Sequence, residues 1–166
     1  MAAPSDPDVR GFLRQSMVAL VATRSANERP FITPLWFVAD RGSLFITTGT
    51  DSLTARNVGR HPEMTMLFSG ERAGRSDRVL RLRCTATVQR GLPPWRVLLR
   101  IAAKYYASPR ALRVELGNRD KWRIRQRYYQ QVTGGPGHLR VVPTVAEFLP
   151  QPGNARDRVG GRSGVR

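Results

Sequence analysis

Residues 79–90 alternate well between apolar and polar side chains, and this pattern restricts the possible folds more than any other feature. The apolar side chains point to one face of the predicted strand: Leu80, Leu82, Cys84, Ala86 and Val88. The polar side chains point to the other face: Arg81, Arg83, Thr85, Thr87 and Gln89. A period of two is typical of a strand with one buried and one solvated face. An antiparallel sheet packed on a core by one face is therefore expected.

Further strands are predicted from β-branched and aromatic content for residues 17–23, 31–39, 43–48, 63–69 and 139–142. Residues 17–23 and 31–39 are apolar on both faces. Something must then cover the outer face of these strands: helices, a second subunit or a planar ligand. Because Pro34 lacks an N–H, strand 31–39 is expected to be bulged there or to lie at a sheet edge.

Helices are predicted in three places. A short one follows Ser5, a second covers residues 53–59, and a helical insert occupies about 93–131. The first insert helix has two unlike sides, one basic (Arg96, Arg100 and Lys104) and one apolar (Val97, Leu98, Ile101 and Tyr105). Residues 150–166 are rich in glycine and arginine and have little to bury, so a disordered tail is expected.

The charge is strongly positive and unevenly distributed. The formal net charge is +16, from 28 basic and 12 acidic residues. Residues 1–71 are neutral, whereas residues 72–129 carry 14 arginines and two lysines against three acids. A genome that favours arginine would explain the total but not the clustering. The basic region predicts an anionic partner: nucleic acid, a membrane surface or a multiply charged ligand.

Several classes of protein are disfavoured. No apolar run is long enough to span a bilayer, the N-terminal segment is acidic where a signal peptide would be basic, and Cys84 is the single cysteine. A cytoplasmic protein of one domain is expected. No Ser/His/Asp set, nucleotide-binding glycine fingerprint or metal pattern is present, so no catalytic residue and no metal site is predicted.

A series of short motifs then carries a family resemblance. They are Val21-Ala22-Thr23, Arg29 to Phe37 (RPFITPLWF), Gly42 to Gly49 (GSLFITTG), Ser52, Arg56-Asn57 and His61 to Thr65 (HPEMT). In order and spacing these resemble the pyridoxamine 5'-phosphate oxidase-like split-barrel superfamily, most closely its actinobacterial flavin/deazaflavin-dependent oxidoreductases. The resemblance implies a six-stranded antiparallel split β-barrel over residues 1–149, mainly β with helices packed outside, in a homodimer.

The resemblance also implies a cofactor site at the dimer interface. The ring system would lie near Thr33, Pro34 and Trp36. The phosphate would lie near the loop and helix that carry Thr47, Thr48, Gly49, Ser52, Arg56 and Asn57. Hydroxyls, a glycine and a helix N-terminus are by themselves suited to an anion. Thr54 stands where family members commonly carry a lysine, which removes one cation from this site.

The function implied is that of an oxidoreductase that moves a hydride between its cofactor and a small unsaturated substrate. The deazaflavin coenzyme (F-420) is favoured over FMN because it is the more negatively charged and the insert is basic. Two alternatives stay open: a non-enzymatic cofactor or haem binder of the same fold, and a basic protein associated with nucleic acid. Trp36 could also be ordinary interface core.

Overall fold

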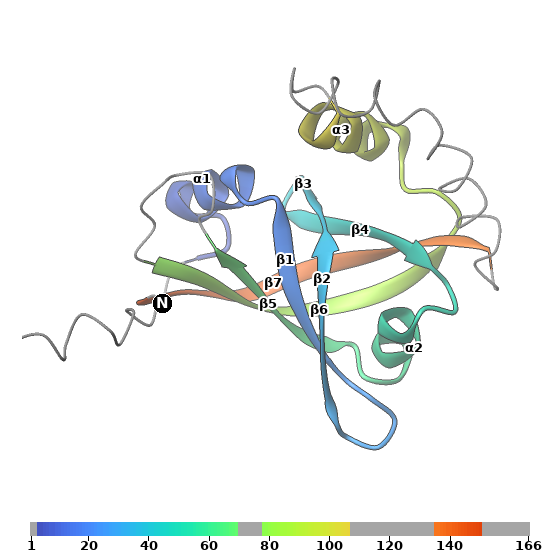
Figure 1. The fold of residues 1–166 in the computed structure, drawn as a ribbon. Helices are drawn as coiled ribbons and strands as arrows, with labels where there is room; N and C mark the ends of the chain where they lie inside the picture. Colours follow the sequence, from blue (N-terminus) through green and yellow to red (C-terminus); the bar gives the residue numbers. More distant parts are fainter. Residues whose placement is uncertain (1–2, 70–77, 107–134, 151–166) are drawn as a thin grey trace, which may run out of the picture.

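The computed structural model describes residues 3–69, 78–106 and 135–150 (Figure 1). The elements in chain order are α1 (Pro7–Gln15), β1 (Val18–Arg24), β2 (Pro30–Trp36), β3 (Val38–Asp40), β4 (Ser43–Gly49), α2 (Leu53–Arg60), β5 (Glu63–Ser69), β6 (Arg78–Arg90), α3 (Trp95–Tyr105) and β7 (Pro136–Pro150). The remaining predicted segments, helices beyond residue 106 and the tail after residue 150, lie outside the described residues.

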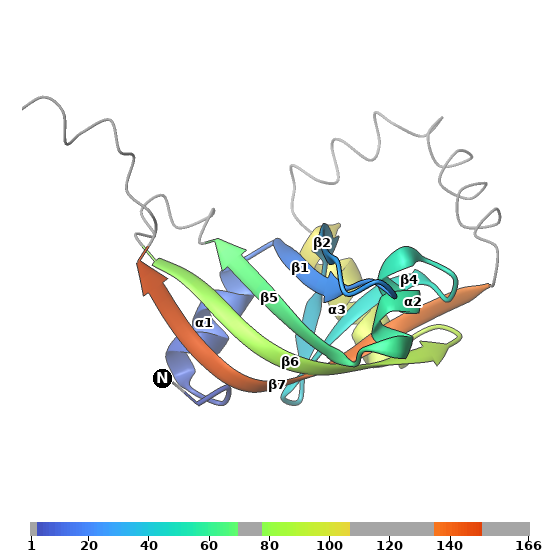
Figure 2. The same cartoon turned by 90° about the horizontal axis from the view of Figure 1, so that it is seen from below.

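All seven strands form one antiparallel sheet in the order β2-β1-β5-β6-β7-β4-β3. Figure 2 shows β5, β6 and β7 side by side as a curved layer, with α1 and α2 toward opposite ends of it. The curl encloses one apolar core, to which α1 contributes Val9 and Leu13 and α2 contributes Ala55 and Val58. The half-barrel agrees with the predicted split-barrel class.

The predicted strand 31–39 is wrong as a single element, and the strand count is seven instead of six. The chain breaks at Phe37, so that β2 pairs with β1 and β3 pairs with β4. The Phe37 N–H donates to the hydroxyl of Tyr105, and the Phe37 carbonyl accepts from Tyr105 and Lys104. Because both backbone groups are bonded to α3 side chains, Phe37 needs no neighbouring strand.

Two other sequence expectations can be compared directly with the sheet. β2 is an edge strand, and Pro34 lies there in unbroken register opposite Leu20, which confirms the edge interpretation. The last strand is much longer than the predicted 139–142, because β7 runs along nearly the whole of β6 with one irregularity between Arg83 and Cys84.

The two sides of α3 differ as predicted, but its basic side is not uniformly solvated. Val97 and Tyr105 are buried in a second apolar cluster with Val38 and Phe45, so α3 covers the outer side of β3 and β4. Arg100 forms an ion pair with Asp40, with Nε 3.0 Å from Oδ1. Lys104 Nζ lies 3.7 Å from the centre of the Phe37 ring. Only Arg96 of the three predicted cations lacks such a contact among the described residues.

Candidate cofactor site

The outer faces of β1 and β2 are apolar and largely exposed in the described structure, although Trp36 at one end stacks on Tyr105 of α3. Ile32 is 61% exposed, Trp36 48% and Leu20 45%. Strand pairing places Val18 beside Trp36, Leu20 beside Pro34 and Ala22 beside Ile32. These six side chains form a continuous surface, which we call the apolar shelf. A shelf of this kind on a sheet indicates a ligand or a second subunit.

Beyond the shelf, the outer face of the sheet becomes polar on β5 and then basic on β6. One cross-strand row runs Ile32, Ala22, Thr65, Arg83, and the row beside it runs Pro34, Leu20, Leu67, Arg81. Arg81 forms an ion pair with Glu147. Arg83 has no acidic partner in the part of the chain that the structure describes. An apolar surface therefore leads to an unpaired guanidinium group.

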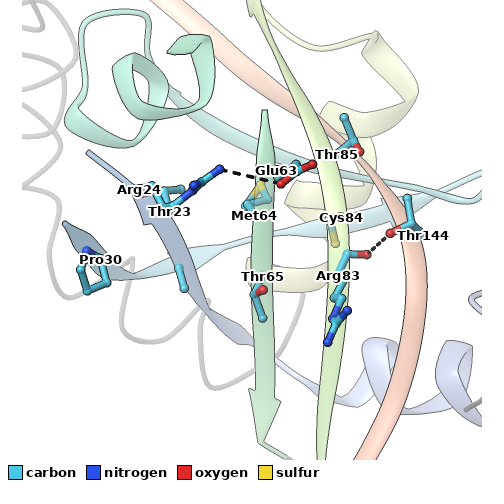
Figure 3. A pocket seen from close by; sticks show the side chains of 11 residues that line it. Thr23, Arg24, Pro30, Glu63, Met64, Thr65, Arg83, Cys84, Thr85 and Thr144 are labelled. Carbon is cyan, nitrogen blue, oxygen red and sulfur yellow. Dashed lines mark hydrogen bonds and ion pairs between the residues drawn. The ribbon is translucent and has the colours of Figure 1, made fainter. Parts of the chain in front are cut away.

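A cavity of about 540 Å³ opens between β1, β5 and β6, and its lining includes Ala22 of the shelf, Thr65 and Arg83 (Figure 3). The ladder between β1 and β5 ends at the pair Ala22–Thr65, and the two strands then diverge. Arg24 and Glu63 lie 3.8 Å apart across this gap, and the Thr144 hydroxyl donates to the Arg83 carbonyl at 3.0 Å. The volume of this cavity lies within the range of small-molecule sites.

Two of the three residues predicted to contact the ring lie on the shelf. The Trp36 indole stacks on the Tyr105 ring, with centroids 4.6 Å apart and planes at 8°. Pro34 lies two residues before it on the same face. Thr33 points to the inner side, opposite the buried Val21, and its hydroxyl has no hydrogen-bond partner among the described residues. The structure thus separates Thr33 from Pro34 and Trp36.

The residues predicted to bind phosphate are brought together only in part. Thr48 and Ser52 form one pair, with hydroxyl oxygens 2.8 Å apart, and Ser52 Oγ also accepts the Ala55 N–H and so caps α2. The two hydroxyls carry two protons and use one between them, so the other remains able to donate to an anion. Gly49 precedes this cap by three residues, and its carbonyl accepts the Ser52 N–H.

The remaining residues of that set lie on other sides of α2 and β4. Arg56 and Asn57 line a second cavity, of about 230 Å³, beside the β1–β2 loop. Asn57 is buried and its Nδ2 donates to Thr23 Oγ1, whereas Arg56 is exposed. Thr47 is exposed and alternates with Thr48 on β4, so it lies on the opposite face of the strand. Thr54 is buried against the core.

The reactive side chains nearby are not arranged for catalysis by the protein itself. Burial raises the pKa of the Cys84 thiol to about 12, so the thiol is neutral, and Cys84 packs in the core as expected of a small apolar residue. Within the described ranges, no three His, Cys, Asp or Glu side chains gather as a metal site. Sequence reasoning missed Arg83 as a site residue, although its alternation already placed it on the wet face.

No helix among the described residues has the length and apolar content to cross a membrane. The chain resembles several solved structures in fold, each at less than 25% identity. An F420 reductase has a TM-score of 0.59 and 17% identity, with 83% of this chain and 94% of that one covered. The conserved hypothetical protein Rv2991 from Mycobacterium tuberculosis has a TM-score of 0.62 and 16% identity, with 98% and 92% covered.

A third structural relative is the haem storage protein HutZ from Vibrio cholerae, with a TM-score of 0.59 and 14% identity, and with 88% of this chain and 94% of that one covered. No curated protein sequence matches the chain. The sequence model of the family described as pyridoxamine 5'-phosphate oxidase matches residues 5–132, more than half of the chain. Together with the curled antiparallel sheet, this match establishes that the chain belongs to the pyridoxamine 5'-phosphate oxidase family.

Proposed function

We propose that this chain is an oxidoreductase that binds a flavin or deazaflavin between two copies of itself. The observation that carries the proposal is the cross-strand row from the exposed apolar shelf to the unpaired Arg83. A flavin-type cofactor has a planar ring system and an anionic arm, and this surface offers an apolar area and a cation side by side. The residues present therefore fit such a group.

Pro34 and Trp36 would hold the ring. Trp36 is fixed by its stack on Tyr105 and still exposes about half of its surface, so it offers a preoriented aromatic contact. A second copy packed on the shelf would exclude water from the ring. When bound, the cofactor supplies hydride transfer to a small unsaturated substrate, and the protein contributes binding and orientation.

The anionic arm would be held by the Thr48–Ser52 hydroxyl pair and the first turn of α2, with Arg83 as a further cation. Arg56, exposed one turn along α2 from Ser52, would have to reach the arm from the neighbouring cavity. A guanidinium group can bind phosphate through two parallel hydrogen bonds. The absence of a lysine at Thr54 makes these arginines more important. The number of unpaired cations also favours the more highly charged deazaflavin coenzyme (F-420) over FMN, the alternative cofactor.

A titration followed by the fluorescence of the cofactor tests this function. FMN and the deazaflavin coenzyme are each added to the wild-type protein, to Trp36→Leu and to the matched control Trp95→Leu, whose tryptophan is exposed on α3. We expect saturable binding that Trp36→Leu weakens about ten-fold or more and Trp95→Leu leaves unchanged. Binding of neither cofactor, or equal loss in both variants, would contradict the proposal.

Haem binding without turnover is the second candidate, since HutZ shares the fold. Both histidines of the chain are described, and neither lines the two cavities above. His138 is buried with Nδ1 3.1 Å from the Gly91 carbonyl, and His61 Nε2 lies 3.6 Å from Glu28. These positions favour the flavin. A histidine-type haem absorption spectrum that is lost in His61→Ala would reverse that preference.

A further inference from the structure

A third cavity, of about 590 Å³, lies where α1, the β3–β4 turn and α3 meet. It contains four arginines, Arg10 and Arg14 of α1, Arg41 of the turn and Arg100 of α3, against one acid, Asp40. This arginine pocket is separate from the proposed phosphate site at the start of α2. The β3–β4 turn lies before β4 and α2 begins after it. Because β4 is roughly 20 Å long at about 3.3 Å per residue, the turn and the start of α2 are separated by about that length.

Within the described residues, the charges in the pocket are neutralised only in part. Asp40 is taken by Arg100, with Nε 3.0 Å from Oδ1. Arg10, Arg14 and Arg41 are exposed and have no acidic partner among the described residues. Three guanidinium groups from two separate elements therefore face one concavity without counter-charges.

Local structure explains these arginines only in part: Arg14 in the last turn of α1 complements the helix dipole, but Arg10 and Arg41 have no such reason. Arg41 has a φ of 47° and Gly42 a φ of 78°, in a two-residue turn where asparagine or glycine is strongly preferred. Arg10 and Arg14 are four residues apart on α1, and like charges at that spacing weaken a helix slightly. A bound anion would relieve the repulsion between Arg10 and Arg14, and its binding to Arg41 would offset the backbone cost there.

We propose that the arginine pocket binds a small organic ligand that carries adjacent phosphate groups, as a diphosphate does. Guanidinium groups suit phosphate oxygens by their paired donors, and three free cations match more charge than one phosphate carries. The volume lies in the range of ligand sites, and Leu13, Leu44 and Pro143 give the pocket an apolar wall for an organic part. The convergence on a concavity distinguishes it from a basic stripe for nucleic acid.

Isothermal titration calorimetry at about 150 mM salt tests the pocket with inorganic pyrophosphate, ADP, AMP and a short single-stranded DNA. The double variant Arg14→Gln/Arg41→Asn removes two cations, retains a helix former in α1 and places a favoured residue in the turn. The control Arg29→Gln/Arg90→Gln removes the same charge from exposed positions that do not line the pocket. Thermal melts check that both variants are folded.

We expect pyrophosphate and ADP to bind saturably, AMP to bind more weakly, and Arg14→Gln/Arg41→Asn to reduce the affinity for pyrophosphate about ten-fold or more. The control should change it less than about two-fold. Equal losses in both variants, or DNA binding without saturable pyrophosphate binding, would overturn the proposal. Flavin binding should be unchanged in the double variant, so this result is independent of the proposed oxidoreductase function.

Discussion

The hydroxyl oxygen of Tyr105 lies 2.9 Å from the backbone nitrogen of Phe37 and 2.7 Å from its carbonyl oxygen. The same hydroxyl is 2.8 Å from the Met17 carbonyl. One side chain of α3 thus satisfies the backbone at the break between β2 and β3 and also contacts the residue before β1. Since the Tyr105 ring stacks on Trp36, this contact also fixes the aromatic residue of the proposed cofactor site.

Tyr105→Phe should destabilise the protein by about 2 kcal/mol, because it leaves a buried N–H of Phe37 without a partner. The ring, and with it the stack on Trp36, is retained. Urea unfolding followed by circular dichroism measures the change in the free energy of unfolding. Thr87→Val, which removes an exposed hydroxyl from β6, is the control. An equal stability of Tyr105→Phe and wild type would contradict this account of the strand break.

Stability should fall as the pH rises above 9, because burial raises the pKa of the Cys84 thiol from 9.0 to about 12. Above pH 9 the unfolded chain releases the thiol proton and the folded chain keeps it, so the free energy of unfolding decreases by at most about 1.4 kcal/mol per pH unit. Burial also raises the pKa of Tyr105, from 10.0 to about 12, which adds a similar loss above pH 10. Between pH 9 and 10, Cys84→Ala should therefore show a shallower decrease than wild type in urea unfolding. Equal slopes would mean that the thiol titrates normally.

The positions and faces of most strands could be predicted from the sequence, since strand periodicity depends on residues close together in the chain. The alternation of residues 79–90 correctly gave the buried and wet faces of β6, with Leu80 and Leu82 in the core. Pro34 correctly indicated a sheet edge. The break at Phe37 could not be predicted, because the partner that replaces the neighbouring strand there is Tyr105, 68 residues away.

The candidate site was less predictable for the same reason. Motif order correctly brought Thr48 and Ser52 together, because they belong to one short loop and cap. The family resemblance placed Thr33 and Trp36 together near the ring, although residues three apart on a strand point to opposite faces. Arg83 became a site residue only through its pairing with Thr65, which is a matter of register between strands.

Substitutions at Ser52 should separate the helix cap from anion binding. Ser52→Ala should lose about 1 kcal/mol of stability, because the Ala55 N–H loses its acceptor. Ser52→Asp retains a good cap and complements the helix dipole, so its melting temperature should stay near that of wild type. Its negative charge should nevertheless weaken flavin binding about ten-fold or more, because it repels the phosphate. Unimpaired flavin binding by Ser52→Asp would place the anionic arm elsewhere.

The apolar shelf should be the contact between two copies of the chain. Ile32→Glu adds a charge at one end of this surface, at its most exposed residue, and burying an unpaired carboxylate in an interface is unfavourable. We therefore expect a dimer for wild type and a folded monomer for Ile32→Glu, measured by size-exclusion chromatography with light scattering. Leu92→Glu is the matched control, because Leu92 is 68% exposed in the loop before α3, away from the shelf. Because the proposed cofactor lies between two copies, the monomer should also bind flavin weakly. A wild-type monomer that binds flavin fully would show instead that one chain forms the complete site.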